Sequence, residues 1–401
     1  MSPGTASSPR PTRRPSSRVV QEVPPYPFAE LERKAAAWSR GKERAINLSI
    51  GDPDLPPPPT VVEAARKALV AEGSHRYPTS RGDRVLLEAI ARWMERRFDV
   101  KVDPEKEVAV LLGSKEGIGG LPHVLADPGE AVLVPDPGYP PYTRGTRLAH
   151  AEVQSFPLLP SRGWLPDWDS VPTEGRLMFL NYPNNPTGGT ATLDQVRPAV
   201  DIARDRGMWL AYDNAYSEVT FEGFSAPSIL QVPGAIDHAI EFHSFSKTFG
   251  MAGWRIGFAV GNREVLASLV KYKSQNDSGA ARPIQAAAAA ALDLYRSAAR
   301  PPEVERSVDE YGRRLRRLSE GLRALGYDVT RPRGSLYLWQ HAPLGDGSAW
   351  ADELLAKHGI LVTPGAAFGP SGTAYVRWAV TVPFGQIEET LRRLSRAPGP
   401  S

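Results

Sequence analysis

A lysine placed among small hydroxyl side chains is the first feature of this sequence that suggests covalent chemistry. The chain has 401 residues, and only 10 of its 48 basic residues are lysines. One of them, Lys247, follows Ser244 and Ser246 a few residues after Ile240–Phe242, which are part of a predicted strand. An amine in such a setting can form a Schiff base with an aldehyde. Lys247 alone is most simply a solvated side chain, but it is a candidate for binding a carbonyl ligand if other polar groups gather around it.

Polar residues also follow three other apolar stretches, each of which is predicted to be a strand. These residues are Gly113-Ser114-Lys115-Glu116-Gly117 after Val108–Leu112, Asn181 to Gly188 after Leu177–Leu180, and Asp213-Asn214-Ala215-Tyr216 after Met208–Tyr212. In an open parallel sheet, ligands bind beyond the carboxyl ends of the strands. We therefore expect a carboxylate, an amide, a phenol, hydroxyls and a lysine to gather at one edge of a sheet.

Taken singly, each of these features is an ordinary cap, turn or surface charge, but together they fit one ligand. A helix that begins at Ser114 presents N–H groups to a phosphate, and Ser244, Ser246 and Arg255 add donors and a cation. A buried Asp213 can hold the proton of a pyridinium nitrogen, and the lysine suits an aldehyde. The ligand that combines these three groups is pyridoxal 5′-phosphate.

The elements that must position these residues alternate between strand and helix. Strands are expected at Val108–Leu112, Ala131–Val134, Ala151–Phe156, Leu177–Asn181, Met208–Asp213, Ile240–Phe245 and Ile256–Val260, with helices from Ser114, from about Tyr139 and over Leu193–Arg206. Near-continuous apolar strands separated by helices are typical of a mostly parallel sheet that is buried on both faces. We expect a three-layer α/β/α large domain plus a smaller α+β domain.

The pattern changes after Asn262. Long helical stretches run to about Leu325, followed by short strands at Tyr327–Thr330, Ser335–Trp339 and Tyr375–Val380, a helix near Ala349–His358 and a last helix from Gln386. Before the large domain, helices are expected over Leu31–Trp38, from Thr60 and after Asp83, and a strand at Ile46–Ile50. We divide the chain into a disordered tail (1–23), a segment that packs with the small domain (24–54), a large cofactor-binding domain (55–270), and linking helices with a small C-terminal domain (271–401).

Composition and charge exclude several classes of protein. The net charge is +3, but residues 1–20 contribute four arginines and no acid, so the remainder carries −1, which argues against a nucleic-acid-binding surface. The absence of cysteine excludes a disulfide scaffold, a Cys-ligated zinc site and an iron–sulfur cluster. No run of 18 apolar residues is present, and residues 1–20 lack the apolar run that is typical of a secretory signal. We expect a cytoplasmic protein that binds neither a membrane nor a nucleic acid.

The combination of motifs resembles the class I/II, fold-type I aminotransferases. The motifs are Asn184-Asn185-Pro186-Thr187-Gly188, the pair Asp213 and Tyr216, and Ser244-Phe245-Ser246-Lys247 with Arg255. They stand in the family's order and spacing, and the likeness extends from Leu31 to Arg392. Within the family, three segments are similar to the LL-diaminopimelate and succinyldiaminopimelate aminotransferase branch, namely Gly113–Ile118, Pro135–Pro140 and Asp277–Gly279. Gly365–Gly369 is similar to the family's glycine-bracketed segment.

The resemblance implies roles around a bound pyridoxal 5′-phosphate. Lys247 carries the cofactor and moves a proton between the substrate Cα and the cofactor. Asp213 pairs with the ring nitrogen, and Tyr216 and Asn185 contact the phenolate oxygen. Tyr139 stacks on the ring.

The resemblance also implies how the phosphate and the substrate are held. The phosphate-binding residues are Ser114, Lys115, Ser244 and Arg255, and the cofactor-binding set further includes Glu116 and Ser246. Tyr77 reaches the phosphate of the neighbouring subunit, so a homodimer with shared active sites is expected. Arg377 clamps the α-carboxylate of the substrate, together with Asn185 and the backbone at Gly51.

Two departures from the family pattern border the substrate pocket. The stretch Ser80–Arg84 replaces a Gly-Leu-Pro-like stretch, and Gln275 stands where the family tends to have asparagine. Arg81, Arg84 and Arg282 are additional cations that either read a second acidic group or lie in solvent. The favoured function is transfer of an amino group from a polar or acidic, diaminopimelate-like amino acid to a 2-oxo acid. The alternative is elimination, replacement or carbon–carbon bond formation with the same cofactor in secondary metabolism.

Overall fold

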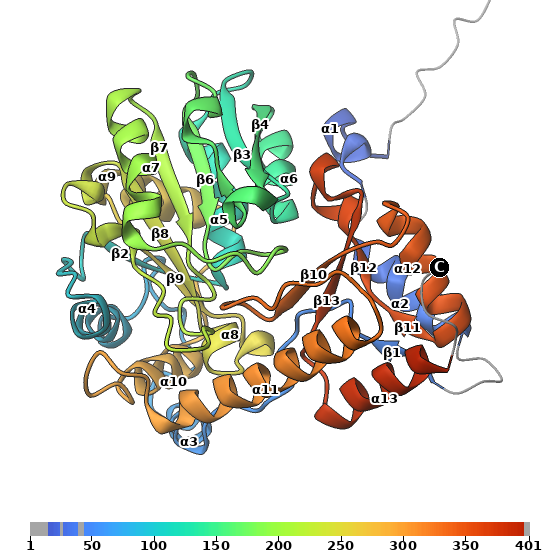
Figure 1. Cartoon of the computed structure of the whole chain (residues 1–401). Coiled ribbons are helices and arrows are strands. Elements are labelled where there is room, and N and C mark those ends of the chain that lie inside the picture. The colour runs from blue at the N-terminus through green and yellow to red at the C-terminus, as the bar shows by residue number, and fades with distance from the viewer. Residues whose placement is uncertain (1–14, 25–26, 39–43, 397–401) are drawn as a thin grey trace, which may run out of the picture.

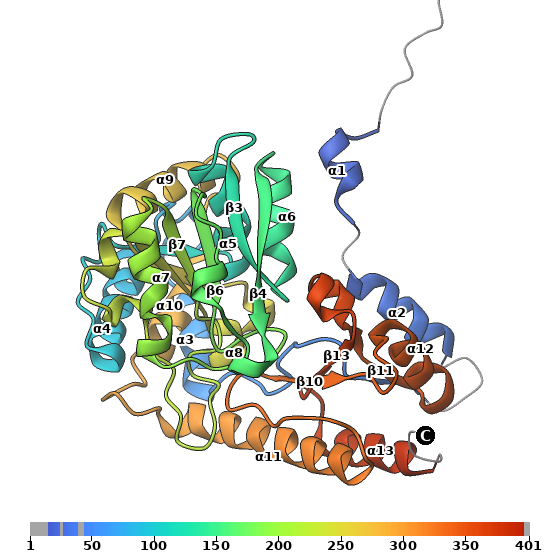
Figure 2. The ribbon, with the colours of Figure 1, turned by 45° about the horizontal axis from the view of Figure 1, so that its top comes forward.

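A computed structural model describes residues 15–24, 27–38 and 44–396 of the chain. Figures 1 and 2 show a large sheet enclosed by helices and, beside it, a smaller body that is built from short strands and helices. The two bodies are joined by the long helix α11 (Pro302–Ala324). The domain boundaries that we expected from the sequence stay a prediction.

The large sheet has eight strands in the order β2-β9-β8-β7-β6-β3-β4-β5. The strands are β2 (Val108–Leu111), β3 (Ala131–Asp136), β4 (Glu152–Leu159), β5 (Leu165–Pro166), β6 (Leu177–Asn181), β7 (Trp209–Asp213), β8 (Ala239–Ser244) and β9 (Gly257–Gly261). The five strands from β8 to β4 pair in parallel, whereas β9 is antiparallel to both of its neighbours and β5 is antiparallel to β4. The expectation of a mostly parallel sheet is therefore confirmed.

Helices cover both faces of this sheet. Strands such as β2, β6 and β9 are therefore buried along their whole length. On one face lie α5 (Ser114–Leu125), α6 (Pro140–Leu148) and α9 (Arg263–Lys273). On the other lie α3 (Pro59–Leu69), α4 (Arg84–Phe98), α7 (Leu193–Asp205) and α10 (Arg282–Leu292). The six alanines Ala286–Ala291 belong to α10, and their small side chains let it lie close against α3 and α4.

The smaller body contains two short sheets and its own apolar core. β10 (Tyr337–His341), β13 (Tyr375–Ala379) and β12 (Thr363–Pro364) form an antiparallel sheet, and β1 (Ile46–Asn47) pairs in parallel with β11 (Ile360–Leu361). The helices are α2 (Pro27–Trp38), α12 (Gly347–His358), α13 (Phe384–Ser395) and part of α11. Short 3₁₀ turns lie at Pro160–Arg162, Trp168–Ser170, Ile229–Gln231, Ala235–Asp237, Ala252–Trp254, Gly365–Phe368 and Pro370–Gly372.

Two expectations about local structure are wrong. The predicted strand Tyr327–Thr330 is reduced to one bridge between Val329 and Gln340, since Pro332 shortly afterwards has no N–H to continue a ladder. The predicted disordered tail contains a short helix, α1 (Arg18–Glu22), which lies beside α6. Residues 1–14 of that tail lie outside the described residues. Within the described ranges, the structure contains no helix with the length and apolar character that a membrane span needs.

A close approach of backbones fixes Gly347 at the start of α12. Its N–H donates to the carbonyl of Thr373 at 2.8 Å. A methyl group there would overlap the carbonyl oxygen of Tyr375 and lie 2.7 Å from its carbonyl carbon. Gly385, in the first turn of α13, has open space in the same position. Glycine is therefore required at the first site and optional at the second.

We predict that Gly347→Ala lowers the free energy of unfolding by about 1–3 kcal/mol, because backbone atoms cannot move aside as a side chain can. Gly385→Ala is the matched control and should leave stability unchanged or raise it by about 0.5 kcal/mol. Thermal unfolding of both variants measures the difference. Equal melting temperatures would contradict the steric argument.

Candidate active site

The polar residues expected at one edge of the sheet do gather there. Asn181 at the end of β6 lies opposite Asp213 at the end of β7, and Asp213 lies opposite Phe242 of β8. The short helix α8 (Phe245–Thr248) follows β8 directly and carries Lys247. Because β6, β7 and β8 are parallel neighbours, the segments that follow them lie at the same edge of the sheet.

Lys247 is held by the segment that follows β1. Its Nζ donates to the carbonyl oxygen of Gly51 at 2.6 Å. Burial lowers the pKa of Lys247, because removal from water disfavours the charged form. A Cβ at position 51 would lie 2.6 Å from Cζ of Tyr337, so this close approach of the backbone requires glycine. Gly51 and Lys247 were both predicted site residues, and the structure brings them into contact.

Asp213 is a buried carboxylate with few donors. The hydroxyl of Tyr142 donates to its Oδ2 at 2.8 Å, and the N–H of Ala215 donates to Oδ1 at 3.3 Å. The Asn181 amide donates to the backbone carbonyl of Asp213 at 2.6 Å and fixes the end of the strand. Burial raises the pKa of Asp213 to about 6. The site thus contains a carboxylate whose negative charge is incompletely compensated.

Arg377 of β13 lies on the side of the site formed by the smaller body. Its guanidinium donates to Oδ1 of Asn185 at 2.8 Å and to the carbonyl of Ser49 at 2.6 Å. The rings of Tyr337 and Phe368 lie 4.1 and 4.7 Å from its Cζ. Arg377 is almost completely buried. Such a planar cation, oriented by carbonyl and ring, is suited to bind a carboxylate with two parallel hydrogen bonds.

Tyr216 connects the same two sides. Its hydroxyl lies 2.8 Å from the hydroxyl of Tyr337. Burial raises the pKa of Tyr216 well above its usual value, so the phenol keeps its proton at neutral pH and remains a donor.

A cradle of backbone and cations lies at the start of α5. Gly113 has φ +81° and turns the chain so that Ser114 begins the helix. A Cβ at Gly257 would lie 2.6 Å from the Ser114 nitrogen, and a Cβ at Gly113 would lie 2.6 Å from a guanidinium nitrogen of Arg255. Arg255 is fixed by the carbonyls of Ala252 at 2.9 Å and Leu112 at 3.3 Å. The N-terminus of a helix beside a fixed cation is suited to hold a phosphate.

Three further predicted residues border this cradle. The Ser244 hydroxyl accepts from the N–H of Ser246 at 3.3 Å and caps α8. Burial lowers the pKa of Lys115, with a smaller contribution from the cations Arg144 and Arg255. The three residues therefore add hydroxyls and positive charge next to the helix N-terminus.

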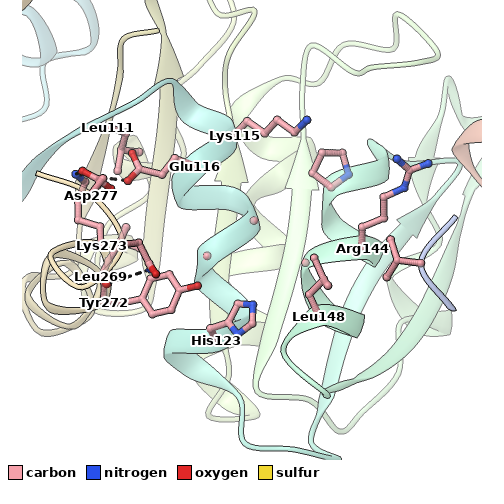
Figure 3. A pocket seen from close by; sticks show the side chains of 16 residues that line it. Leu111, Lys115, Glu116, His123, Arg144, Leu148, Leu269, Tyr272, Lys273 and Asp277 are labelled. Atoms are coloured by element: carbon pink, nitrogen blue, oxygen red, sulfur yellow. Dashed lines mark hydrogen bonds and ion pairs between the residues drawn. The ribbon is translucent and has the colours of Figure 1, made fainter. Parts of the chain in front are cut away.

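Glu116 points away from the cradle. Figure 3 shows Lys115 and Glu116 on opposite sides of α5 around a pocket of 460 Å³ between α5, α6 and α9. The Glu116 carboxylate accepts from the N–H of Leu112 and lies 3.4 Å from Nζ of Lys273, which in turn lies 2.7 Å from Asp277. Burial raises the pKa of Glu116 to about 7. Its contacts are those of a residue that supports the first turn of α5, and direct binding of the cofactor by its carboxylate stays a prediction.

Tyr77 is the predicted site residue that lies on the surface of one protomer, where it is 82% exposed. Tyr139 borders the site, because it precedes α6 with its ring edge-on to that of Tyr142 at 5.6 Å. The three additional arginines are tied to their own surroundings. Arg81 donates to the carbonyl of Val108 at 2.8 Å, Arg84 to Glu88 at 2.7 Å, and Arg282 lies 3.8 Å from Asp83.

Sequence reasoning missed two tyrosines of the site. Tyr142 lies one helical turn after Tyr139, so the repeat of aromatic residues in Tyr139-Pro140-Pro141-Tyr142 was a usable signal. Tyr337 lies in a strand of the smaller body, and no local motif marks it. Only the meeting of β10 with the edge of the large sheet reveals it.

The chain is similar to known aminotransferases along most of its length. A family model described as aminotransferase class I and II matches residues 43–394. The LL-diaminopimelate aminotransferase of Desulforudis audaxviator is 43% identical over 384 residues, which cover 94% of this chain and 96% of the relative. That of Dehalococcoides mccartyi (strain 195) is 42% identical and is covered to 98%.

Solved structures with the same fold belong to enzymes of more than one specificity. Substrate-bound BacF from Bacillus subtilis is 33% identical with a TM-score of 0.91, covering 97% of this chain and 99% of that chain. Aspartate aminotransferase from Thermus thermophilus with maleate is 30% identical with a TM-score of 0.88, covering 96% and 100%. On this evidence the chain belongs to the class I and II aminotransferases, a family of enzymes that depend on pyridoxal 5′-phosphate.

Proposed function

We propose that this aminotransferase takes the amino group of a diaminopimelate-like amino acid and passes it to a 2-oxo acid. The observation that carries the proposal is the meeting of Lys247, Asp213 and Arg377, an amine, a carboxylate and a guanidinium from three distant parts of the chain, at one edge of the sheet. The relatives that are 42–43% identical are LL-diaminopimelate aminotransferases, which supports the choice of substrate.

The site residues fit pyridoxal 5′-phosphate. The glycine-lined cradle at Ser114 has no room for a Cβ at Gly113 or Gly257, so its N–H groups stay accessible to a phosphate. Asp213 is buried with its charge incompletely compensated, which suits a protonated ring nitrogen. When bound, the cofactor supplies an aldehyde that bonds an amine and a ring that accepts electrons from the substrate carbon.

The chain's own residues then bind, orient and move protons. The lowered pKa of Lys247 favours a neutral Nζ that can take a proton from the substrate Cα. Tyr216 keeps its proton and would donate it in a hydrogen bond to the phenolate oxygen of the bound cofactor. Arg377 and Asn185 hold the α-carboxylate and so orient the Cα hydrogen toward Lys247. Tyr139 is assigned to the ring face.

We further propose a homodimer whose sites are shared. Tyr77 is 82% exposed, and Leu69, Val70 and Val85 nearby in the chain are also largely exposed. Apolar side chains gathered in this way are typical of an interface with another subunit. In such a dimer Tyr77 of one subunit serves the phosphate of the other. The cytoplasmic location expected from the cysteine-free sequence stays a prediction.

The pKa of Asp213 predicts a pH-dependent cost in the cofactor-free protein. A carboxyl group whose pKa rises from about 3.9 in the unfolded chain to about 6 in the folded one destabilises the fold when it ionises. The cost is absent below pH 4 and complete above pH 6. Asp213→Asn removes this cost. As the pH rises from 4 to 7.5, the free energy of unfolding of the variant should therefore increase relative to that of wild type by about 3 kcal/mol.

Unfolding curves at pH 4.5, 6 and 7.5 measure this gain. Asp293→Asn, at a partly exposed carboxylate on the surface, is the control and should follow wild type at every pH. If the free energy of unfolding depends on pH in the same way in wild type and in Asp213→Asn, the raised pKa of Asp213 is contradicted.

The proposed reaction is tested with the holoenzyme, LL-diaminopimelate and 2-oxoglutarate. We expect one glutamate for each diaminopimelate consumed and no release of ammonia, with Lys247→Ala inactive as the control. Ammonia without glutamate would favour elimination instead, because replacement leaves the amino group on its product. Transfer from neutral amino acids only would overturn the substrate class and leave the reaction type intact.

Mixing two inactive variants tests the shared sites. Tyr77→Ala and Lys247→Ala each damage a different part of one composite site. When the two are refolded together, half of the dimers are mixed, and one site of each mixed dimer contains only intact residues. About a quarter of wild-type activity should return, as two-fold symmetry requires. A mixture that stays as inactive as its components would show that Tyr77 serves its own subunit.

A further inference from the structure

Tyr337 joins the two halves of the site through both ends of its side chain. We propose that it is a positioning residue, whose hydroxyl orients the proton of Tyr216 and whose ring supports the guanidinium of Arg377. The inference rests on the proposed roles of Tyr216 and Arg377 and adds what holds them in place. Tyr337 is 3% exposed and belongs to β10 of the smaller body.

The hydroxyl end meets the large sheet. The two phenol oxygens of Tyr337 and Tyr216 lie 2.8 Å apart, and the rings meet edge to face at 5.7 Å and 73°. A phenol has one proton to donate. If Tyr337 donates to Tyr216, the proton of Tyr216 is left to point into the site.

The ring end meets Arg377. β10 and β13 pair with Trp339 opposite Arg377, so Tyr337, two residues along β10, projects from the same face of the sheet as Arg377. The Arg377 Cζ lies 4.1 Å from the centre of the Tyr337 ring. A cation over the ring draws electron density from it and strengthens the Tyr337 hydroxyl as a donor. The same contact therefore holds Arg377 and favours donation from Tyr337 to Tyr216.

The backbone at Gly51 fixes the Tyr337 ring. A Cβ there would lie 2.5 Å from Cε1 of Tyr337 and 2.6 Å from Cζ, so the ring rests directly against the glycine. The carbonyl of the same residue accepts from Nζ of Lys247. Any tilt of the ring would press on this backbone, and Tyr337 is therefore held in one orientation between three site residues.

The two ends are separable by substitution. Tyr337→Phe removes the hydroxyl and keeps the ring, whereas Tyr337→Leu removes both. Phe368→Leu removes the other ring beside Arg377, 4.7 Å from its Cζ, and leaves both phenols. Tyr375→Phe is the matched control, because this tyrosine lies on neighbouring β13 and stacks on Trp339 at 5.2 Å.

The hydroxyl is tested by titrating the absorbance of the bound cofactor against pH, in the holoenzyme without substrate. A donor to a phenolate oxygen lowers its pKa, so Tyr216→Phe should raise the midpoint. Tyr337→Phe should raise it in the same direction by a smaller amount, and should add nothing in the Tyr216→Phe background. A midpoint unchanged by Tyr337→Phe, or raised equally in both backgrounds, would overturn the role of the hydroxyl. Tyr375→Phe should titrate as wild type.

The ring is tested by steady-state kinetics. Tyr337→Leu and Phe368→Leu should each raise KM for the amino acid about 3- to 30-fold, whereas Tyr337→Phe should leave KM within about twofold and lower kcat. Unchanged KM in both leucine variants would overturn the role of the ring. If the wild-type enzyme transfers no amino group, the proposed function fails, while the titration without substrate still decides the role of the hydroxyl.

Discussion

The carbonyl groups of residues 48–51 hold the site together, because this short segment accepts hydrogen bonds from both bodies of the molecule. Leu48 accepts from the N–H of Ala379, and Ile50 accepts from the hydroxyl of Thr381. Ser49 accepts from Arg377, and Gly51 accepts from Lys247. A buried donor without an acceptor is costly, so the amine of Lys247 and the guanidinium of Arg377 tie this segment in place as firmly as it ties them. The spacing between Lys247 and Arg377 follows from this constraint.

The same region contains buried ionisable groups whose charges have few partners. Asp213 is buried with one phenol and one long N–H contact, and burial raises its pKa. The pKa of Lys247 is shifted in the opposite direction, because burial lowers it. Groups whose environments shift their pKa values toward neutrality are typical of sites that move protons. The apolar cores of the large sheet and of the smaller body offset this cost.

Two tyrosines outside the recognised motifs complete the arrangement. Tyr142 stacks on Phe179 at 4.7 Å and donates to Asp213, whereas Tyr337 lies between Tyr216 and Arg377. Each is buried, so its hydroxyl needs a partner, and in both cases the partner is a predicted site residue. Support of this kind decides whether a set of catalytic groups is held closely enough to react.

The sequence by itself determined the fold class, the family and the motif residues near Lys247. Those motifs are local, since Asp213 and Ser244 end the strands that position them and Ser114 comes shortly after β2. The carboxyl ends of parallel strands share one edge. The family resemblance also led us to expect Arg377 and Gly51 there, whereas only the tertiary structure revealed that Tyr337 of the smaller body meets that edge and that Gly51 contacts Lys247. Tyr337 and Gly51 stand far from Lys247 in the chain, and their contacts depend on how β10 and β1 pack against the large sheet. The direction of Glu116 was likewise undecided, because a position in the first turn of a helix does not determine which neighbouring element its side chain contacts. The position of Lys273 at the end of α9, and of Asp277 just beyond it, determined the contact.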